Sequence, residues 1–236
     1  MNIRLYYPNS IVENSTDLLS KEHTHYVVNV MRLKRGSSIN LFNKEGEWRC
    51  EIIFLDKDRV EVKFLEKIKQ SNDLSKIELA ICLIKKSPME TIFQKATELG
   101  VKKIIPLISE RTEIKELNYD RAKKIVIEAT EQSNQLNPPE ISEVTKFKDF
   151  LKNVNSTTKI LFADVNSKKN LTSEDFKDIK SICILIGPEG DFSPAERESI
   201  FKNQAVIPFT LSKNILRSDT AVISAISLVN FINKFN

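Results

Sequence analysis

The stretch Ser181–Phe192 (SICILIGPEGDF) decides the fold. Its first six residues form a short apolar run, which is typical of a strand buried on both faces of a sheet. Gly187 and Gly190 bracket the four-residue turn that follows, although the whole chain has only five glycines. Glycine allows a tight turn or a close approach of the backbone to a ligand. The stretch therefore predicts a buried strand that ends in a ligand-binding loop.

A helix start comes directly after this loop. Ser193 offers a capping hydroxyl, Pro194 takes the first helical position, and Glu196 can reach back to a free amide. A strand, a glycine turn and a helix in this order form a ligand loop at the carboxyl edge of an α/β sheet. We therefore expect an α/β fold.

A second stretch, Leu211–Ala221 (LSKNILRSDTA), repeats this arrangement. Residues 206–211 are strand-like, and Ser218, Asp219 and Thr220 are candidate caps for an apolar helix over about 220–235. This helix is equally compatible with a subunit interface and with an ordinary core position.

The blocks Ile186–Ser193 and Leu211–Ala221 resemble, in order and spacing, the RsmE family of SPOUT-class RNA methyltransferases. The similarity extends to Met89–Val101 and to Ser109–Arg111. Members of this family methylate N3 of a uridine in 16S ribosomal RNA. The resemblance implies that residues 71–236 form a trefoil-knotted α/β domain, which binds S-adenosylmethionine and assembles as a homodimer.

Residues 1–70 are predicted to form a small, mostly β domain. Apolar residues alternate over 48–54 and again over 60–64, which indicates short hairpins with one apolar face and hence a small barrel. Ser20 is predicted to cap a helix with Tyr26, Val27, Val30 and Met31 on one face. By its position, the domain resembles the PUA-like RNA-binding domain of the same family.

The polar stretch 67–75 is predicted to link the two domains. A strand over 77–84, a helix capped by a Ser87–Glu90 capping box and ended by Gly100, and a strand over 101–109 should follow. This order is typical of the crossover in a parallel sheet. Another helix is expected over about 120–136, and another strand over 158–164.

Composition limits the choice of function less than the motifs do. At 236 residues the chain can form two domains, and its net charge of +4 allows a nucleic-acid partner without requiring one. Cys50, Cys82 and Cys183 lie far apart in apolar runs, so we expect free core thiols and no metal site. The start lacks a secretory signal, and the apolar stretch 221–232 is too short for a membrane span. We expect a cytoplasmic protein without a membrane partner.

Methyl transfer requires positioning of the reactants and removal of the proton from the uracil imide. Arg217 is the predicted catalytic residue, because a nearby cation stabilises the deprotonated base. The alternative is that Arg217 pairs with Glu189 or Asp219 and only holds the loops together. The sequence nominates no general base.

By resemblance, backbone groups of the two loops would bind the cofactor. The predicted cofactor-binding residues are Leu161, Ile186, Gly187, Pro188, Glu189, Gly190, Leu211, Ser212, Asn214, Ile215 and Leu216. Ser212 stands where the family commonly has glycine, which is a departure in the adenine contact.

Arg4, Arg32, Lys34 and Arg35 are the predicted RNA-binding residues. For the last three, the alternative is a solvated helix end whose cations complement the helix dipole. The expected partner is 16S ribosomal RNA or the small ribosomal subunit. Gln135 stands where the family usually has arginine, so we assign no RNA contact there.

The sequence lacks the motifs of two other classes of nucleotide-binding domain, but it leaves two alternative functions open. The glycine fingerprints of a dinucleotide-binding domain and of a P-loop are both missing from the sequence. A SPOUT enzyme that acts on another RNA position remains an alternative. So does a non-catalytic RNA-binding or ribosome-assembly protein, which the departures at Gln135 and Ser212 would favour.

Overall fold

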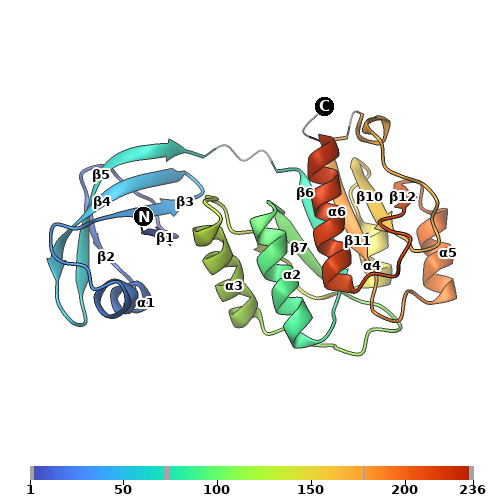
Figure 1. The fold of residues 1–236 in the computed structure, drawn as a ribbon, viewed down its shortest axis with the longest axis horizontal. Helices are drawn as coiled ribbons and strands as arrows, with labels where there is room; N and C mark the ends of the chain where they lie inside the picture. The colour runs from blue at the N-terminus through green and yellow to red at the C-terminus, as the bar shows by residue number, and fades with distance from the viewer. Residues whose placement is uncertain (1–2, 72–74, 178, 234–236) are drawn as a thin grey trace. The chain divides into compact units, whose positions relative to one another are not determined.

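The computed structural model describes residues 3–71, 75–177 and 179–233 (Figure 1). The chain forms two compact units. Met1–Asp73 and Thr130–Asn137 make up the first unit, and Leu74–Ala129 and Pro138–Asn236 make up the second. The first unit therefore draws on two separate parts of the chain.

The first unit contains a five-stranded sheet with the order β1-β3-β4-β5-β2. The strands are β1 (Arg4–Tyr6), β2 (Thr16–Leu18), β3 (Ser38–Asn43), β4 (Gly46–Leu55) and β5 (Val60–Gln70). β1 runs parallel to β3, and the other neighbours are antiparallel. This confirms that the N-terminal part is mostly β.

The predicted alternation in β4 holds up to a bulge. Cys50 and Ile52 are fully buried, as are Val60 and Val62 on β5. Phe54, however, is 44% exposed, because the register of the β4–β5 pair shifts between Ile52 and Phe54. A bulge adds one residue to one strand and so changes which face the next side chains occupy.

The predicted helix at residue 20 is shorter than expected. Ser20 caps α1 (Lys21–His25), and its hydroxyl accepts a hydrogen bond from the His23 amide at 3.1 Å. The chain then continues as a π-helical turn, η1 (Tyr26–Val30). Val27 is buried, but Val30 is 56% exposed and Met31 is also exposed. The prediction of one apolar face was wrong because the wider turn rotates these residues away from it.

Part of the predicted linker is strand. β5 continues to Gln70, which lies opposite Gly46 on β4. Lys67 faces Trp48 across the two strands, with its Nζ atom 4.7 Å from the centre of the indole ring. Cross-strand pairing and this cation–π contact explain why a polar sequence forms a strand here. Residues 72–74 of the predicted linker lie outside the described residues.

The second unit contains a parallel seven-stranded sheet with the order β12-β10-β11-β6-β7-β8, and β9 also pairs with β7. The strands are β6 (Ile77–Cys82), β7 (Lys103–Ile108), β8 (Glu140–Ile141), β9 (Thr145–Lys146), β10 (Thr158–Ala163), β11 (Ser181–Ile186) and β12 (Val206–Phe209). The helices are α2 (Lys86–Glu98), α3 (Tyr119–Gln132), α4 (Phe147–Asn153), the 3-10 turn η2 (Ser173–Phe176), α5 (Pro194–Lys202) and α6 (Ser218–Asn233), and the end of α3 from Thr130 onward belongs to the first unit. The predicted α/β class is confirmed.

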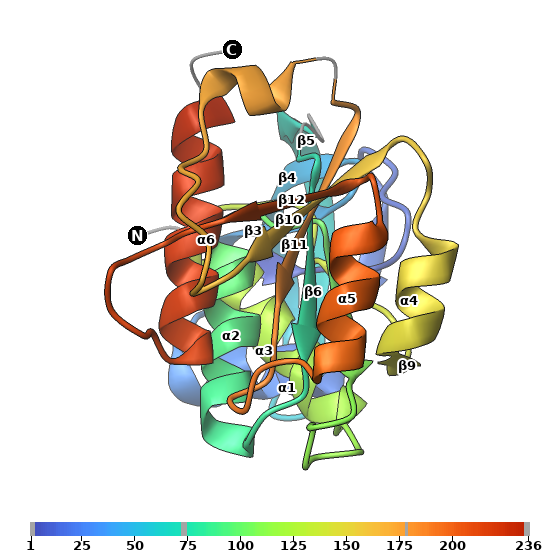
Figure 2. The same ribbon diagram turned by 90° about the vertical axis from the view of Figure 1, so that its right-hand side faces the viewer.

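Helices cover both faces of this sheet. Figure 2 shows α2 and α6 on one side of the strands, and α4 and α5 on the other. Leu79 and Ile81 on β6 pack with the first helix pair, whereas Ala80 and Cys82 pack with the second. The central strands are therefore buried on both faces, which explains their continuous apolar sequence.

Two helix caps test the predictions from local sequence. The Ser193 box is confirmed: Ser193 Oγ accepts from the Glu196 amide at 3.3 Å, and Glu196 Oε2 accepts from the Ser193 amide at 3.0 Å. The Ser87 box is wrong, because α2 begins at Lys86, with Lys85 at the cap and no side-chain hydrogen bond there. Gly100 has a φ of +83° and ends α2 as predicted.

The three cysteines are free and buried, as expected. Burial raises the pKa of the Cys50 and Cys82 thiols to about 12, so both stay protonated at neutral pH. In the described part of the chain, no group of three His, Cys, Asp or Glu side chains is arranged to hold a metal ion. None of the described helices is both long enough and apolar enough to cross a membrane. The last residues of the helix predicted to reach 235 lie outside the described ranges.

Candidate active site

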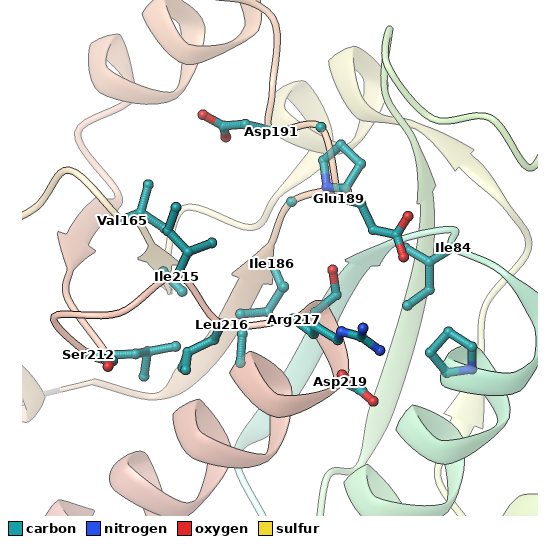
Figure 3. A pocket seen from close by; sticks show the side chains of 18 of the residues that line it. Ile84, Val165, Ile186, Glu189, Asp191, Ser212, Ile215, Leu216, Arg217 and Asp219 are labelled. Carbon is teal, nitrogen blue, oxygen red and sulfur yellow. The ribbon is translucent and has the colours of Figure 1, made fainter.

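A pocket of about 970 Å³ lies beyond the carboxyl ends of four neighbouring strands of the second unit. Its walls are the start of α2 with the residues before it, the turn after β10, the loop after β11, and the segment between β12 and α6. The carboxyl edge of a parallel sheet is where such folds bind ligands. Figure 3 shows side chains from these segments converging on one space.

The pocket brings together nearly all of the predicted cofactor residues with Arg217. Its lining includes Ile186, Gly187, Pro188, Glu189, Gly190, Leu211, Ser212, Asn214, Ile215, Leu216 and Arg217. Leu161 is the exception, because its fully buried side chain packs into the core between the sheet and the helices α2 and α6.

The loop Gly187–Phe192 is a tight turn in which the Asp191 amide donates to the Pro188 carbonyl at 3.0 Å. At Gly187, an added Cβ would lie 3.1 Å from the Phe192 ring, so only glycine fits without displacing that ring. At Gly190, the nearest atom to an added Cβ would be Arg111 Cδ at 3.9 Å, which is ordinary contact. The residue with left-handed backbone is Asp191, with a φ of +58°. The two glycines of the motif therefore have different roles.

Residues outside the motif hold the loop. Arg111 donates from Nη1 to the Gly190 carbonyl at 2.9 Å. The buried Glu196 carboxylate accepts from the Glu110 amide at 2.9 Å as well as from the Ser193 amide. The segment after β7 is thus attached to the loop after β11. Ser109–Arg111 is part of the family resemblance, but no pattern in the sequence assigns these residues to the site.

A second support comes from Arg197 on α5, which forms ion pairs with Asp164 and Asp191. Asp164 and Asp191 are among the residues that line the pocket, whereas Arg197 is not. The sequence did not single out this trio, whose members are separated by up to 33 residues.

Arg217 is exposed and lines the pocket just before α6 begins. Among the described residues, no hydrogen bond or ion pair joins its guanidinium group to Glu189, to Asp219 or to any other side chain. Figure 3 shows the guanidinium on the same side of the pocket as Glu189 and Asp219. The structure therefore does not show the loop-locking ion pair that was the alternative to a catalytic role.

Arg4 was predicted to contact RNA, but its guanidinium group is bound by other groups of the first unit. Its guanidinium pairs with the buried Glu47 at 3.0 Å and donates to the carbonyls of Glu131 and Gln135 at 2.8 and 2.9 Å. It also lies 4.3 Å from the centre of the Phe42 ring. All faces of this side chain therefore have structural partners, and no signal in the local sequence indicated them.

Arg32, Lys34 and Arg35 are exposed on the segment that follows η1. Within the described residues, their side chains form no ion pairs. Arg32 has a φ of +51° and directly follows Met31, the C-cap of η1, so the chain leaves the helical path at this residue. The three cations remain available to a ligand.

Comparisons with known proteins define the family. A profile for the RNA methyltransferase domain matches residues 70–230, and a profile for the RNA methyltransferase PUA domain matches residues 19–65. Ribosomal RNA small subunit methyltransferase E of Rickettsia conorii is 36% identical over 97% of this chain and 95% of its own length.

Solved structures agree. The Neisseria gonorrhoeae ribosomal RNA small subunit methyltransferase E bound to S-adenosylmethionine has a TM-score of 0.90 and 28% identity, with 98% of each chain covered. A methyltransferase from Legionella pneumophila, in complex with the same cofactor, has a TM-score of 0.87 and 29% identity, also over 98% of each chain.

The parallel sheet, its pocket and the two profiles define the class as a SPOUT RNA methyltransferase with a PUA domain. Within that class, the chain belongs to the family of ribosomal RNA small subunit methyltransferase E.

Proposed function

We propose that this chain transfers a methyl group from S-adenosylmethionine to N3 of a uridine in 16S ribosomal RNA. Membership of the family supports the activity and the RNA substrate. The observation that carries the proposal is the pocket, because it joins both signature loops to Arg217, which has no ion-pair partner among the described residues.

The residues of the pocket fit the cofactor. The charged residues that line it are Lys85, Asp164, Glu189, Asp191, Arg217 and Asp219. Arg197 pairs with Asp164 and Asp191, and with this cation included the carboxylates still outnumber the cations by four to three. S-adenosylmethionine carries a sulfonium centre, and an excess of carboxylates favours a cation. Apolar side chains such as Ile84, Ile186 and Leu216 complete the lining and suit an adenine ring. The loops 187–191 and 211–216 would hold the cofactor, which supplies the activated methyl group.

The protein's own contribution is to position the uridine and to favour loss of its imide proton. Arg217 lines the pocket and has no carboxylate partner in the part of the chain that the structure describes, so its charge would be free to stabilise the uracil anion. Glu189 and Asp219 are nearby carboxylates of the same pocket.

The first unit would bind the RNA backbone. Arg32, Lys34 and Arg35 form one exposed cationic segment, and Lys and Arg are the residues that neutralise phosphates. We leave Arg4 out of this surface, because Glu47 and two carbonyls occupy its guanidinium group.

Further features belong to the same proposal. We place the protein in the cytoplasm, where free buried thiols are stable. The five-stranded sheet would close into a barrel, and the second unit would carry the trefoil knot of SPOUT enzymes.

The protein would act as a homodimer. In support of the homodimer, Ile215 at the rim of the pocket is 87% exposed, and a partner subunit would cover it.

Calorimetric titration with S-adenosylmethionine, followed by nucleoside analysis of treated 16S RNA and of small subunits, tests the proposal. We expect cofactor binding and the formation of N3-methyluridine. Methylation at another atom would identify a different SPOUT activity. RNA binding by a folded protein that does not bind the cofactor would instead favour the non-catalytic alternative.

The RNA surface has its own test. Replacing Arg32, Lys34 and Arg35 together by Gln should weaken RNA binding and lower the slope of log affinity against log salt by about 0.7 to 0.9 for each lost phosphate contact. The affinity for S-adenosylmethionine should not change. Gln replacements at Lys57 and Arg59, which are exposed cations of the same unit, serve as the control. Equal RNA affinity of both variants would exclude this surface.

A further inference from the structure

We propose that Arg197 is a positioning residue for the cofactor, because its guanidinium group clamps together two carboxylates on different walls of the pocket. The inference rests on S-adenosylmethionine being the ligand of this pocket. Arg197 itself does not line the pocket, so it would act only through Asp164 and Asp191.

The clamp is a three-residue ion-pair network. Arg197 Nη2 lies 2.8 Å from Asp164 Oδ1, and Arg197 Nη1 lies 2.9 Å from Asp191 Oδ2. The side chain of Asp164 is only 4% exposed and that of Arg197 is 19% exposed, so solvent screens their pair weakly. The guanidinium carbon also lies 5.7 and 5.4 Å from the centres of the Phe162 and Phe201 rings. Two rings and two carboxylates therefore fix its orientation.

On one wall, Asp164 shapes the turn that follows β10. Its Oδ1 atom also accepts from the Asn166 amide at 3.1 Å, and its carbonyl accepts from the Ser167 amide at 3.1 Å. Its own amide donates to the Phe209 carbonyl at the end of β12. The carboxylate bound to Arg197 thus lies at the start of a turn that includes Val165, another residue of the pocket.

On the other wall, Asp191 stabilises the turn that follows β11. Its φ of +58° is unfavourable for a residue with a side chain, although Asp tolerates it better than most. Asp191 Oδ1 accepts from the Phe192 amide at 2.7 Å, while Oδ2 binds Arg197. The ion pair therefore helps to hold the strained residue of the loop Gly187–Phe192 in place.

Loss of Arg197 would leave Asp164 buried without a counter-ion, and it would free Asp191 from its only ion-pair partner within the described residues. The turn that carries Asp164 would then rearrange, because burial of an unpaired carboxylate is unfavourable, and the turn at Asp191 would lose one of the contacts that hold it. Arg197 does not line the pocket, so it does not contact the cofactor directly. Cofactor affinity should therefore fall, whereas turnover at saturating cofactor should persist.

The test compares Arg197→Met, Arg197→Lys and Asp191→Asn with the wild type in the full chain. In steady-state methylation of 16S RNA, we expect Arg197→Met to raise KM for S-adenosylmethionine by about tenfold to a hundredfold, with kcat within about twofold. Calorimetry should show the same change in Kd. Arg197→Lys should give an intermediate KM, since lysine keeps the charge but cannot bind both carboxylates in fork geometry.

Arg59→Met is the matched control. Arg59 also binds one carboxylate, that of Glu61, and lies 5.3 Å from the centre of a phenylalanine ring, but it belongs to the first unit. The Arg59→Met variant should have the same KM and Kd for the cofactor as the wild type.

An unchanged KM in folded Arg197→Met, or a fall in kcat without a rise in KM, would overturn the inference. Should Arg197→Met fail to fold, Asp191→Asn decides, because it removes only the half-exposed arm of the network. An Asp191→Asn protein with wild-type KM overturns the clamp. A wild type that binds no S-adenosylmethionine would overturn the proposed function and this inference together, whereas equal binding by wild type and variants overturns the inference alone.

Discussion

Replacing each glycine of the cofactor loop by alanine should give two very different proteins. Both substitutions add one methyl group to the same turn, Gly187–Phe192. Neither glycine has a φ in the left-handed region, so alanine meets no backbone strain at either position. The difference between the two variants therefore measures packing alone.

The surroundings of each added Cβ set the size of the effect. At Gly187 the methyl group would lie 3.1 and 3.3 Å from two atoms of the Phe192 ring. That ring is 1% exposed and packs against Phe147 and Phe162, with ring centres 4.6 and 5.8 Å away. It has no room to withdraw, so Gly187→Ala should cost about 1 to 3 kcal/mol, as overpacking usually does. At Gly190 the nearest atom is 3.9 Å away, so Gly190→Ala should be close to neutral.

Thermal unfolding and calorimetric titration with S-adenosylmethionine measure both consequences. Gly187→Ala should unfold about 2 to 12 °C below the wild type if each kcal/mol shifts the midpoint by about 2 to 4 °C, and it should bind the cofactor more weakly, because the displaced Phe192 moves the loop. Gly190→Ala should match the wild type in both measurements. The packing argument would be refuted if Gly187→Ala had the unfolding midpoint and cofactor affinity of the wild type. It would also be refuted if Gly190→Ala were less stable or bound the cofactor more weakly while Gly187→Ala did not.

Three further outcomes are expected. Arg217→Met should lower kcat for RNA methylation by about a hundredfold or more while Kd for S-adenosylmethionine changes little, and a fall in cofactor affinity with normal kcat would contradict its catalytic role. Arg4→Met should destabilise the first unit by about 3 kcal/mol in denaturant unfolding, because it leaves Glu47 buried without a cation, and a neutral result would show that Arg4 is dispensable for the fold. Burial lowers the pKa of His23 below its usual value, so His23 should contribute stability that is present above about pH 6.5 and is lost as the pH falls toward its folded-state pKa. His23→Gln should flatten this part of the stability-against-pH curve, and an unchanged curve would refute the assignment.

The strands and the loops of the site were predictable because each is specified by a continuous piece of sequence. Ile182–Ile186 is apolar throughout, as a central parallel strand requires, and Ser193 with Glu196 forms the cap of α5 within four residues. These elements form as the local sequence predicts, because tertiary contacts favour the same local conformations. Gly100 ends its helix for the same reason: its φ of +83° suits glycine above all other residues.

The errors arose where a local pattern depends on a distant partner. Phe54 continues the alternation of β4 in sequence, but the register shift against β5 turns it outward. Lys67 belongs to a polar stretch, yet pairing with Trp48 keeps it in a strand. Arg4 looked like a free cation because its partner, Glu47, is 43 residues away. No pattern of spacing along one chain reveals such pairs.

The same limit applies to the site itself. The motif residues provide the surface of the pocket, but the loop Gly187–Phe192 owes its shape to side chains outside that motif. Arg111 binds the Gly190 carbonyl, Glu196 connects Ser193 to Glu110, and Arg197 binds Asp191. A loop with a strained residue keeps one conformation only when its surroundings over-determine it. Substitutions at these supporting positions should therefore affect cofactor affinity as strongly as substitutions within the loop, even though the motif alone identifies the family.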